Sequence, residues 1–226
     1  MIEFYAPTHD APELLLSPLH QAVLLTLRHL VVTGPIGLTP NKALKRYFVT
    51  WAADQFNWPG YTSSDLFKLN KVLNEQDFPP LFVLHDLLLA AKLARHRKGF
   101  LHIAKTGKDL LEHPGSLWLV LAQHLLLTAG QDDCLEVDWV SVLNALNVAA
   151  HKGITDEDFC SRALSMEEND YRLKSLVYVH VLRPLCWLGL LYETRHKPSE
   201  RFFTKTALWP LALTFEETAT PPVTTL

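Results

Sequence analysis

The sequence predicts a mainly α-helical protein with short β-hairpins, built from two similar units in tandem. Three observations support this fold class. Apolar residues recur at helical spacing along most of the chain, a short strand follows each of two long apolar helices, and the two regions that contain these strands resemble each other. The chain has 226 residues, of which 48% are hydrophobic and 20% charged, so a substantial core is expected. This composition is unlike that of a collagen or a disordered chain.

The first half of the chain predicts an extended lead-in over 1–16 and a first unit over 17–113. Ser17 before Pro18 is a typical N-cap arrangement, which predicts a helix to about Val32. The further elements expected in this unit are a helix that Thr39-Pro40 opens and that runs to about Phe56, a short helix capped by Ser63 or Ser64, an apolar helix over Leu81–Ala94, a strand over Phe100–Ile103 and a helix over Lys105–Leu111.

The second half predicts a unit over 114–213 and a flexible tail over 214–226. Thr155-x-x-Asp158 forms a capping box with acidic residues in the first turn, where the helix dipole favours them. The further elements expected here are a helix that Ser116 caps, a helix over Trp139–Ala150, a long helix over Tyr171–Tyr192 with Pro184 in its first turn or at a kink, a strand over Arg201–Thr204 and a helix over Ala207–Leu213.

The internal repeat pairs Leu88–Arg95 with Leu185–Tyr192, and each segment is followed by a basic turn, a strand and a Lys-Thr pair. The distance from the helix to Lys-Thr is 11 residues in the first copy (Ala94 to Lys105) and 14 in the second (Leu191 to Lys205). Three helices followed by a hairpin, with this basic turn as its loop, resemble a winged helix-turn-helix. The chain therefore resembles two tandem winged helices.

The first copy also resembles the bacterial plasmid ORF-three-like proteins. The resemblance rests on an early Leu-Thr before a basic helix and on a scattered pattern, which here consists of Leu38-Thr39 with Lys42, Lys45 and Arg46, then Leu84-His85, Leu93, Arg95, Lys98-Gly99 and Thr106. The chain departs from the family pattern because Thr106 and Gly107 are adjacent. The resemblance implies the fold and little about activity.

Cysteine usage and hydropathy indicate a soluble protein of a reducing, cytoplasmic compartment. The three cysteines are odd in number, and each is 26 residues from the next (Cys134, Cys160, Cys186), which fits neither a disulfide framework nor a metal site. The N-terminus shows no signal peptide. The apolar stretch Leu117–Leu127 has roughly 11 residues, whereas a membrane span needs about 20, and Val177–Leu191 contains Arg183. We therefore expect no membrane contact.

Catalytic and cofactor motifs are absent from the sequence. It contains no P-loop, no dinucleotide glycine fingerprint, no Gly-x-Ser-x-Gly and no His-Glu-x-x-His. The eleven histidines include His85, His124 and His180 in apolar helices, where a satisfied core histidine is commoner than a metal ligand. We expect no enzyme, no metal and no cofactor.

Charge is distributed unevenly, and this suggests two functions. Residues 39–108 carry 11 basic and 5 acidic side chains, a balance of +6, whereas 132–170 carries 2 basic and 10 acidic ones, a balance of −8. The first hypothesis is binding of DNA, mainly through phosphates, by basic wings. The residues expected to contact nucleic acid are Lys42, Lys45, Arg46, Lys68, Lys71, Arg95, Arg97, Lys98, Lys105, Lys108, Arg195, Lys197, Arg201 and Lys205.

Base readout is not favoured, because the third helix offers only His85, Asp86 and Lys92 among leucines. Any sequence specificity is expected to come from the wing or from the helix near residues 64–74. The second hypothesis is a protein-interaction module or a subunit of a larger complex, in which the acidic 132–170 segment faces a basic partner. The apolar third helix is then buried between the two units or in a partner, and a homodimer is one such assembly.

Overall fold

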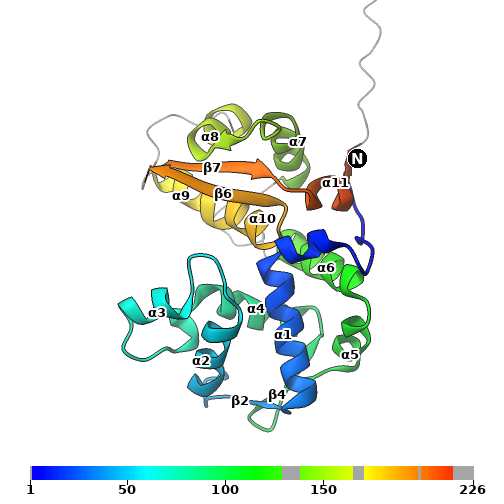
Figure 1. The fold of residues 1–226 in the computed structure, drawn as a ribbon, viewed down its shortest axis with the longest axis vertical. Helices are drawn as coiled ribbons and strands as arrows, with labels where there is room; N and C mark the ends of the chain where they lie inside the picture. Colours follow the sequence, from blue (N-terminus) through cyan, green and yellow to red (C-terminus); the bar gives the residue numbers. More distant parts are fainter. Residues whose placement is uncertain (1, 129–137, 165–170, 198–199, 216–226) are drawn as a thin grey trace, which may run out of the picture.

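The computed structural model describes residues 2–128, 138–164, 171–197 and 200–215 (Figure 1). The protein is mainly α-helical with small antiparallel sheets, as the sequence predicts. The elements of its first part are β1 (Ile2–Phe4), η1 (Pro12–Leu16), α1 (Pro18–Val32), β2 (Ile36–Gly37), α2 (Arg46–Gln55), α3 (Ser63–Leu69), η2 (Glu75–Asp77), α4 (Pro79–Ala90), β3 (Ala94–Arg97), β4 (Phe100–Ile103) and α5 (Lys105–Leu111).

The second part follows α5, and two of its helical segments include π-helical turns, η3 after α6 and η5 between α9 and α10. Its elements are α6 (Pro114–Gln123), η3 (His124–Thr128), α7 (Trp139–Ala149), β5 (Ile154–Thr155), α8 (Asp156–Leu164), α9 (Tyr171–Val177), η5 (Tyr178–Leu182), α10 (Arg183–Trp187), β6 (Leu191–Lys197), β7 (Glu200–Lys205), α11 (Leu208–Ala212) and β8 (Leu213–Phe215). In the described part of the chain, no helix is both long enough and apolar enough to cross a bilayer.

The same sheet topology occurs twice. In the first unit the antiparallel order is β2-β4-β3, and in the second it is β5-β7-β6. In each case a helix precedes the first strand, further helices follow it, and the last of them leads into a hairpin. Apart from the short first strand, this is the order of helices and hairpin that the sequence predicts for each unit. We name residues 94–103 wing 1 and the β6–β7 hairpin wing 2.

The repeat extends to individual hydrogen bonds where the third helix of each unit meets its wing. Leu93 N donates to Leu88 O at 2.9 Å, and Leu190 N donates to Leu185 O at the same distance. The pairing of Leu88–Arg95 with Leu185–Tyr192 is therefore correct. The pairing of the two Lys-Thr motifs is wrong by two residues, because Ala94 pairs with Ile103 in wing 1 while Leu191 pairs with Lys205 in wing 2.

Several expected boundaries differ from the observed ones. The helix that stands before β5, as α1 stands before β2, is α7, so the second copy of the topology does not begin with the helix at 114. That helix, α6, instead packs on α1 and α5. Its N-cap is His113 and not Ser116, and the cap of α3 is Thr62 and not Ser63 or Ser64. Ser17, by contrast, caps α1 as predicted, accepting a hydrogen bond from His20 N.

The ends of the described chain are joined. The lead-in is not simply extended, because β1 pairs with β8 (Ile2 with Phe215, Phe4 with Leu213) and residues 12–16 form the 3-10 turn η1. Thr214 and Phe215 of the expected tail thus lie in a strand, and 216–226 fall outside the described residues.

Two apolar helices end earlier than the sequence predicts. The apolar helix α4 ends at Ala90, so Lys92 lies in a left-handed turn (φ 55°) and His96 lies on β3. The long helix expected over 171–192 ends at Trp187, with Pro184 in the first turn of α10. Both helices end where they do because the following residues belong to strands, β3 after α4 and β6 after α10, which pair with β4 and β7.

The two units share one continuous hydrophobic core. Trp118 of α6 is fully buried, and its indole Nε1–H donates to Leu188 O at 2.8 Å. Trp58 of the first unit meets Trp187 of the second edge to face, with ring centroids 5.5 Å apart. The left-handed Gly189 (φ +76°) lets the backbone come close, since an added Cβ would lie 2.6 Å from the Leu16 carbonyl. These contacts fix the second unit against α1 and α6.

His20 of α1 joins this core in its neutral form. Its Nε2–H donates to Pro114 O at 3.0 Å, and burial lowers its pKa from 6.5 to about 4. The unfolded chain therefore takes up a proton between pH 6.5 and pH 4 that the folded protein does not. The contribution of neutral His20 to the free energy of unfolding is therefore fully present above pH 6.5. We expect the free energy of unfolding to fall by up to about 3 kcal/mol as the pH drops to 4.

Urea unfolding at a series of pH values measures this dependence, with His20→Gln as the comparison because glutamine also carries an N–H donor. As the pH falls from 6.5 to 4, the wild type should lose stability through His20 while the variant does not. The difference in the free energy of unfolding between the two proteins should therefore narrow. Parallel pH profiles for the two proteins would contradict the assignment.

Candidate nucleic-acid interface

Strand alternation places the arginines of wing 1 on one face of its sheet and the residues that pack on the helices on the other. Ala94 and His96 of β3 pair with Ile103 and Leu101 of β4, and this set faces the helices, with Leu101 fully buried. The intervening residues lie on the opposite face of the sheet, which is open to solvent. These are Arg95, Arg97, Phe100 and His102.

A two-residue turn brings a further cation to the tip of wing 1. Lys98 and Gly99 both have positive φ values, 49° and 76°, which is the geometry of a tight type I′ hairpin loop. Glycine adopts this geometry without cost, and the Lys98 side chain is exposed at the end of the hairpin.

Lys45 reaches the same open face from the start of α2. Gly37 of β2 pairs with Phe100, so a side chain at Gly37 would point the same way as Phe100. The stem of Lys45 occupies that place, since a Cβ on Gly37 would lie 2.9 Å from Lys45 Cδ. We define the wing-1 face as Lys45, Arg95, Arg97, Lys98, Phe100 and His102.

The position of Lys45 depends on a late start of α2. The sequence predicts a helix from Thr39-Pro40, but residues 39–42 form a turn in which Lys42 is left-handed (φ 64°), and α2 begins at Arg46. Lys45 N then donates to Gly37 O at 3.0 Å, which holds this residue beside β2. The neighbouring Tyr47 hydroxyl accepts from Gly37 N at 2.7 Å.

A buried polar relay holds wing 1 against the helices. Glu75 Oε1 accepts from His85 Nδ1 at 2.6 Å, and its Oε2 accepts from Leu44 N at 2.5 Å. His85 Nε2 then meets His96 Nε2 of β3 at 2.9 Å. Burial lowers the pKa of His96, and the charges of His85 and Lys42 lower it further. The relay connects α4, wing 1 and the segment before α2, so it positions Lys45 relative to the wing.

Five other cations expected in the first unit lie outside the wing-1 face, whereas Lys42 is close enough to His96 of β3 to lower its pKa. Lys68 of α3 forms an ion pair with Asp65 at 3.2 Å, and Lys71 is exposed just beyond it. Lys105 and Lys108 are exposed on α5. Figure 1 shows α3 and α5 on opposite sides of the unit, so the lysines of these two helices do not lie next to each other. Arg46 is exposed at the start of α2, where its Nε donates to Asn74 Oδ1 at 2.9 Å.

Wing 2 turns its cations the opposite way. Arg201 pairs with Arg195 and is two residues from the fully buried Phe203, so both arginines share the helix-facing side of the sheet. Arg201 meets Asp156 at 3.1 Å and stacks on the Tyr178 ring at 3.9 Å, while Arg195 bonds Glu193 at 3.0 Å. The expected basic surface on wing 2 is thus internally neutralised.

Lys205 is the remaining expected cation of wing 2 whose side chain the structure describes, and it is bonded within the protein. Lys205 donates to Asn147 O at 2.8 Å, and its partial burial lowers its pKa. The backbone of Lys197 lies in β6, but its side chain is outside the described part. The open face of this sheet carries Tyr192 and Thr194, at the positions that Arg95 and Arg97 occupy in wing 1.

The third helix of the first unit, α4, is equipped for packing. It contains no Arg, Lys, Asn or Gln, and its buried residues include Leu84, His85 and Leu88. Phe82 and Asp86 are exposed on its outer side. His85 is accordingly a satisfied core residue, and α4 offers no side chain that pairs with base edges in the usual bidentate way.

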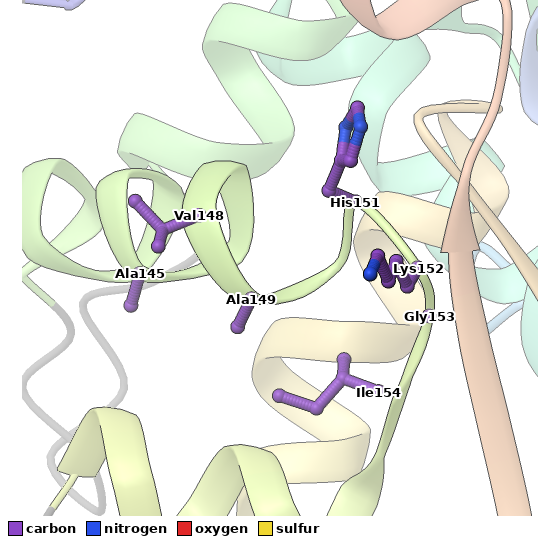
Figure 2. Close-up of a pocket in the computed structure, with 7 residues that line it drawn as sticks. All are labelled: Ala145, Val148, Ala149, His151, Lys152, Gly153 and Ile154. Atoms are coloured by element: carbon purple, nitrogen blue, oxygen red, sulfur yellow. The ribbon is translucent and has the colours of Figure 1, made fainter.

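A separate hollow of about 640 Å³ lies in the second unit. It is lined by Ala145, Val148, Ala149, His151, Lys152, Gly153 and Ile154, at the C-terminal end of α7 and the start of β5 (Figure 2). The lining is mostly apolar, and none of its seven residues carries a carboxylate, hydroxyl or thiol. In the described part of the chain, no three side chains of His, Cys, Asp or Glu are grouped as metal ligands.

Sequence reasoning finds the cations of wing 1 but misses the residues that organise the face. Phe100, Tyr47 and Glu75 are not among the expected site residues. For Phe100 the signal is present in the alternation of Phe100–Ile103, because a strand with Leu101 and Ile103 inward must place Phe100 outward. The partners of Glu75 are 10 and 31 residues away in the chain, so no local pattern identifies it.

Comparison with known proteins gives a family for both units. Residues 15–116 match the family model described as Y4jL N-terminal domain, and residues 129–207 match the y4jL C-terminal domain. The uncharacterized protein y4jL of Sinorhizobium fredii (strain NBRC 101917 / NGR234) is 36% identical over 159 residues, which cover 67% of this chain and 72% of that protein. No solved structure matches the chain significantly.

The descriptions of these models and of this relative mention neither the plasmid ORF-three-like proteins nor a winged-helix family. The two matched ranges together contain the described elements from α1 to β7, apart from most of α6 and η3. On this evidence the chain belongs to the y4jL family.

Proposed function

We propose that this protein is a non-enzymatic, regulatory nucleic-acid-binding protein whose wing-1 face contacts phosphates. One observation carries the proposal: Lys45, Arg95, Arg97 and Lys98 lie together on one open face. Within the described residues, none of the four has an acidic partner. Unpaired cations gathered on one surface attract a polyanion, because binding releases the counterions of the phosphates.

The proposal concerns the first unit. The helix-facing arginines of wing 2 have carboxylate partners and would have to leave them in order to reach a phosphate. Because α4 carries no base-reading side chain, binding should depend mainly on the phosphate backbone and only weakly on sequence.

Titration of a random-sequence 30-base-pair duplex across salt concentrations tests the proposal. If each of the four cations contacts one phosphate, the logarithm of the affinity should fall with the logarithm of the salt concentration with a slope of about −3 to −4. Fluorescence anisotropy of an end-labelled duplex measures both the affinity and the slope. No binding at low salt would overturn the proposal and favour the candidate below.

The second candidate is a protein-interaction module, and it is supported by the outer side of α4, where Phe82 is 51% exposed. Its acidic surface receives less support from the described residues. In 138–164, Asp138 caps α7, Asp156 pairs with Arg201, Glu157 pairs with Lys174, and the Asp158 carboxylate accepts a hydrogen bond from the Thr155 hydroxyl. Residues 132–137 and 165–170, which hold the other acids, fall outside the described part.

A further inference from the structure

We infer that the wing-1 face binds single-stranded nucleic acid, with an unpaired base stacked on Phe100. This inference rests on the proposed function and specifies its ligand. It starts from the place of the Phe100 ring, which is 44% exposed on the open face of the sheet although large aromatic side chains usually gain stability by burial. The core does not require a phenylalanine at this position, because Leu101 provides the inward contact of β4.

The surroundings of Phe100 are those of a stacking platform. Arg97 of β3 pairs with Phe100 on one side, and Gly37 of β2 pairs with it on the other. The Lys45 side chain lies over Gly37. The His102 ring lies two residues further along the strand, with its centroid 6.3 Å from that of Phe100 in an edge-on arrangement. An aromatic ring between cations is the combination that binds unpaired nucleotides, because the ring stacks on a base while the cations hold the phosphates.

Tyr47 adds a second ring next to this site. It is 55% exposed, and its hydroxyl is held by the N–H of Gly37, the residue that pairs with Phe100. This anchor fixes the ring beside β2, so little conformational freedom is lost when a base stacks on it.

The same features give no advantage with a duplex. Base pairs in a duplex are stacked on each other and their faces are not accessible, so Phe100 would have nothing to stack on. Reading of duplex sequence would fall to α4, which presents Phe82 and Asp86 outward and has no Arg, Lys, Asn or Gln. The wing-1 face therefore combines phosphate contacts with accessible rings, which suits an unpaired strand.

The test compares the full-length protein on labelled 30-nucleotide thymidine and uridine strands with the 30-base-pair duplex at one salt concentration. The thymidine and uridine strands distinguish DNA from RNA as the source of the unpaired strand. We expect the preferred single strand to bind at least about 10-fold more tightly than the duplex. Phe100→Leu should weaken its binding about 5- to 150-fold and weaken duplex binding far less, because the duplex offers no open base face to the ring.

Two variants make the comparison specific. Phe100→Tyr keeps an aromatic ring and should retain single-strand affinity, while Phe82→Leu makes the same change at a similarly exposed phenylalanine on α4 and should have no effect. If the duplex binds as well as the single strands and Phe100→Leu changes nothing, the inference is wrong and the proposed function stands. If neither nucleic acid binds at low salt, the proposed function itself is wrong.

Discussion

Reversing the charge of Arg95, Arg97 and Lys98 to glutamate is expected to weaken nucleic-acid binding roughly 100-fold or more. Each cation exposed on the wing-1 face contributes a charge-assisted contact to a phosphate, and the glutamates would repel the phosphates instead. The melting temperature should change by less than about 2 °C, because none of the three side chains has an ion-pair partner among the described residues. Anisotropy titration and thermal unfolding of the same preparations measure both effects.

The matched control reverses Arg28, Lys152 and Arg172 to glutamate, three exposed cations outside the wing. This variant has the same net charge as the wing variant, so any general electrostatic effect should be equal in both. Binding should fall far less in the control. Equal losses in the two variants would show that net charge, and not the wing-1 face, governs the interaction.

Leu88→Ala is expected to lower the free energy of unfolding by about 2–5 kcal/mol. Leu88 is fully buried in α4, and its carbonyl accepts the hydrogen bond from Leu93 N that leads the chain into wing 1. Removing its side chain leaves a cavity in the core, and the cost depends on how far the surrounding residues relax. Urea unfolding measures the change, and an unchanged m-value would show that the two-state comparison is valid.

The neighbouring Leu89→Ala provides the control, because the same atoms are removed from a partly exposed position on the same helix. Its loss should be clearly smaller. A loss below roughly 1 kcal/mol for Leu88→Ala would mean that this side of α4 is open to solvent, and a role of α4 in contacting the nucleic acid would then have to be reconsidered.

The hydrogen bonds from Glu75 through His85 to His96 hold the short hairpin of wing 1 in place against the helices. The wing has a loop of only two residues, and it is attached to α4 through His85 and His96. The same carboxylate holds Leu44 N, one residue before Lys45. A buried carboxylate thus connects the cations of β3 and the cation before α2, which the sequence places about 50 residues apart.

The sequence by itself determined the fold class, the cap of α1 at Ser17, the capping box at Thr155 and the repeat between the two third helices. These features depend on contacts within a few residues or on a hydrophobic period, and both are visible in a linear chain. The cations of wing 1 were also visible, because Arg95, Arg97 and Lys98 are close in the sequence.

Only the tertiary structure decided which basic residues form a surface. Both wings are basic in sequence, but alternate residues of a strand lie on opposite faces of the sheet. Whether the arginines are exposed therefore depends on which residues of the strand are buried in the core. In wing 1 the core takes Ala94 and His96, and the arginines face outward. In wing 2 it takes Phe203, and Arg201, two residues away, must face inward toward Asp156. Pairing between distant strands and helices sets this choice, and no local pattern contains it.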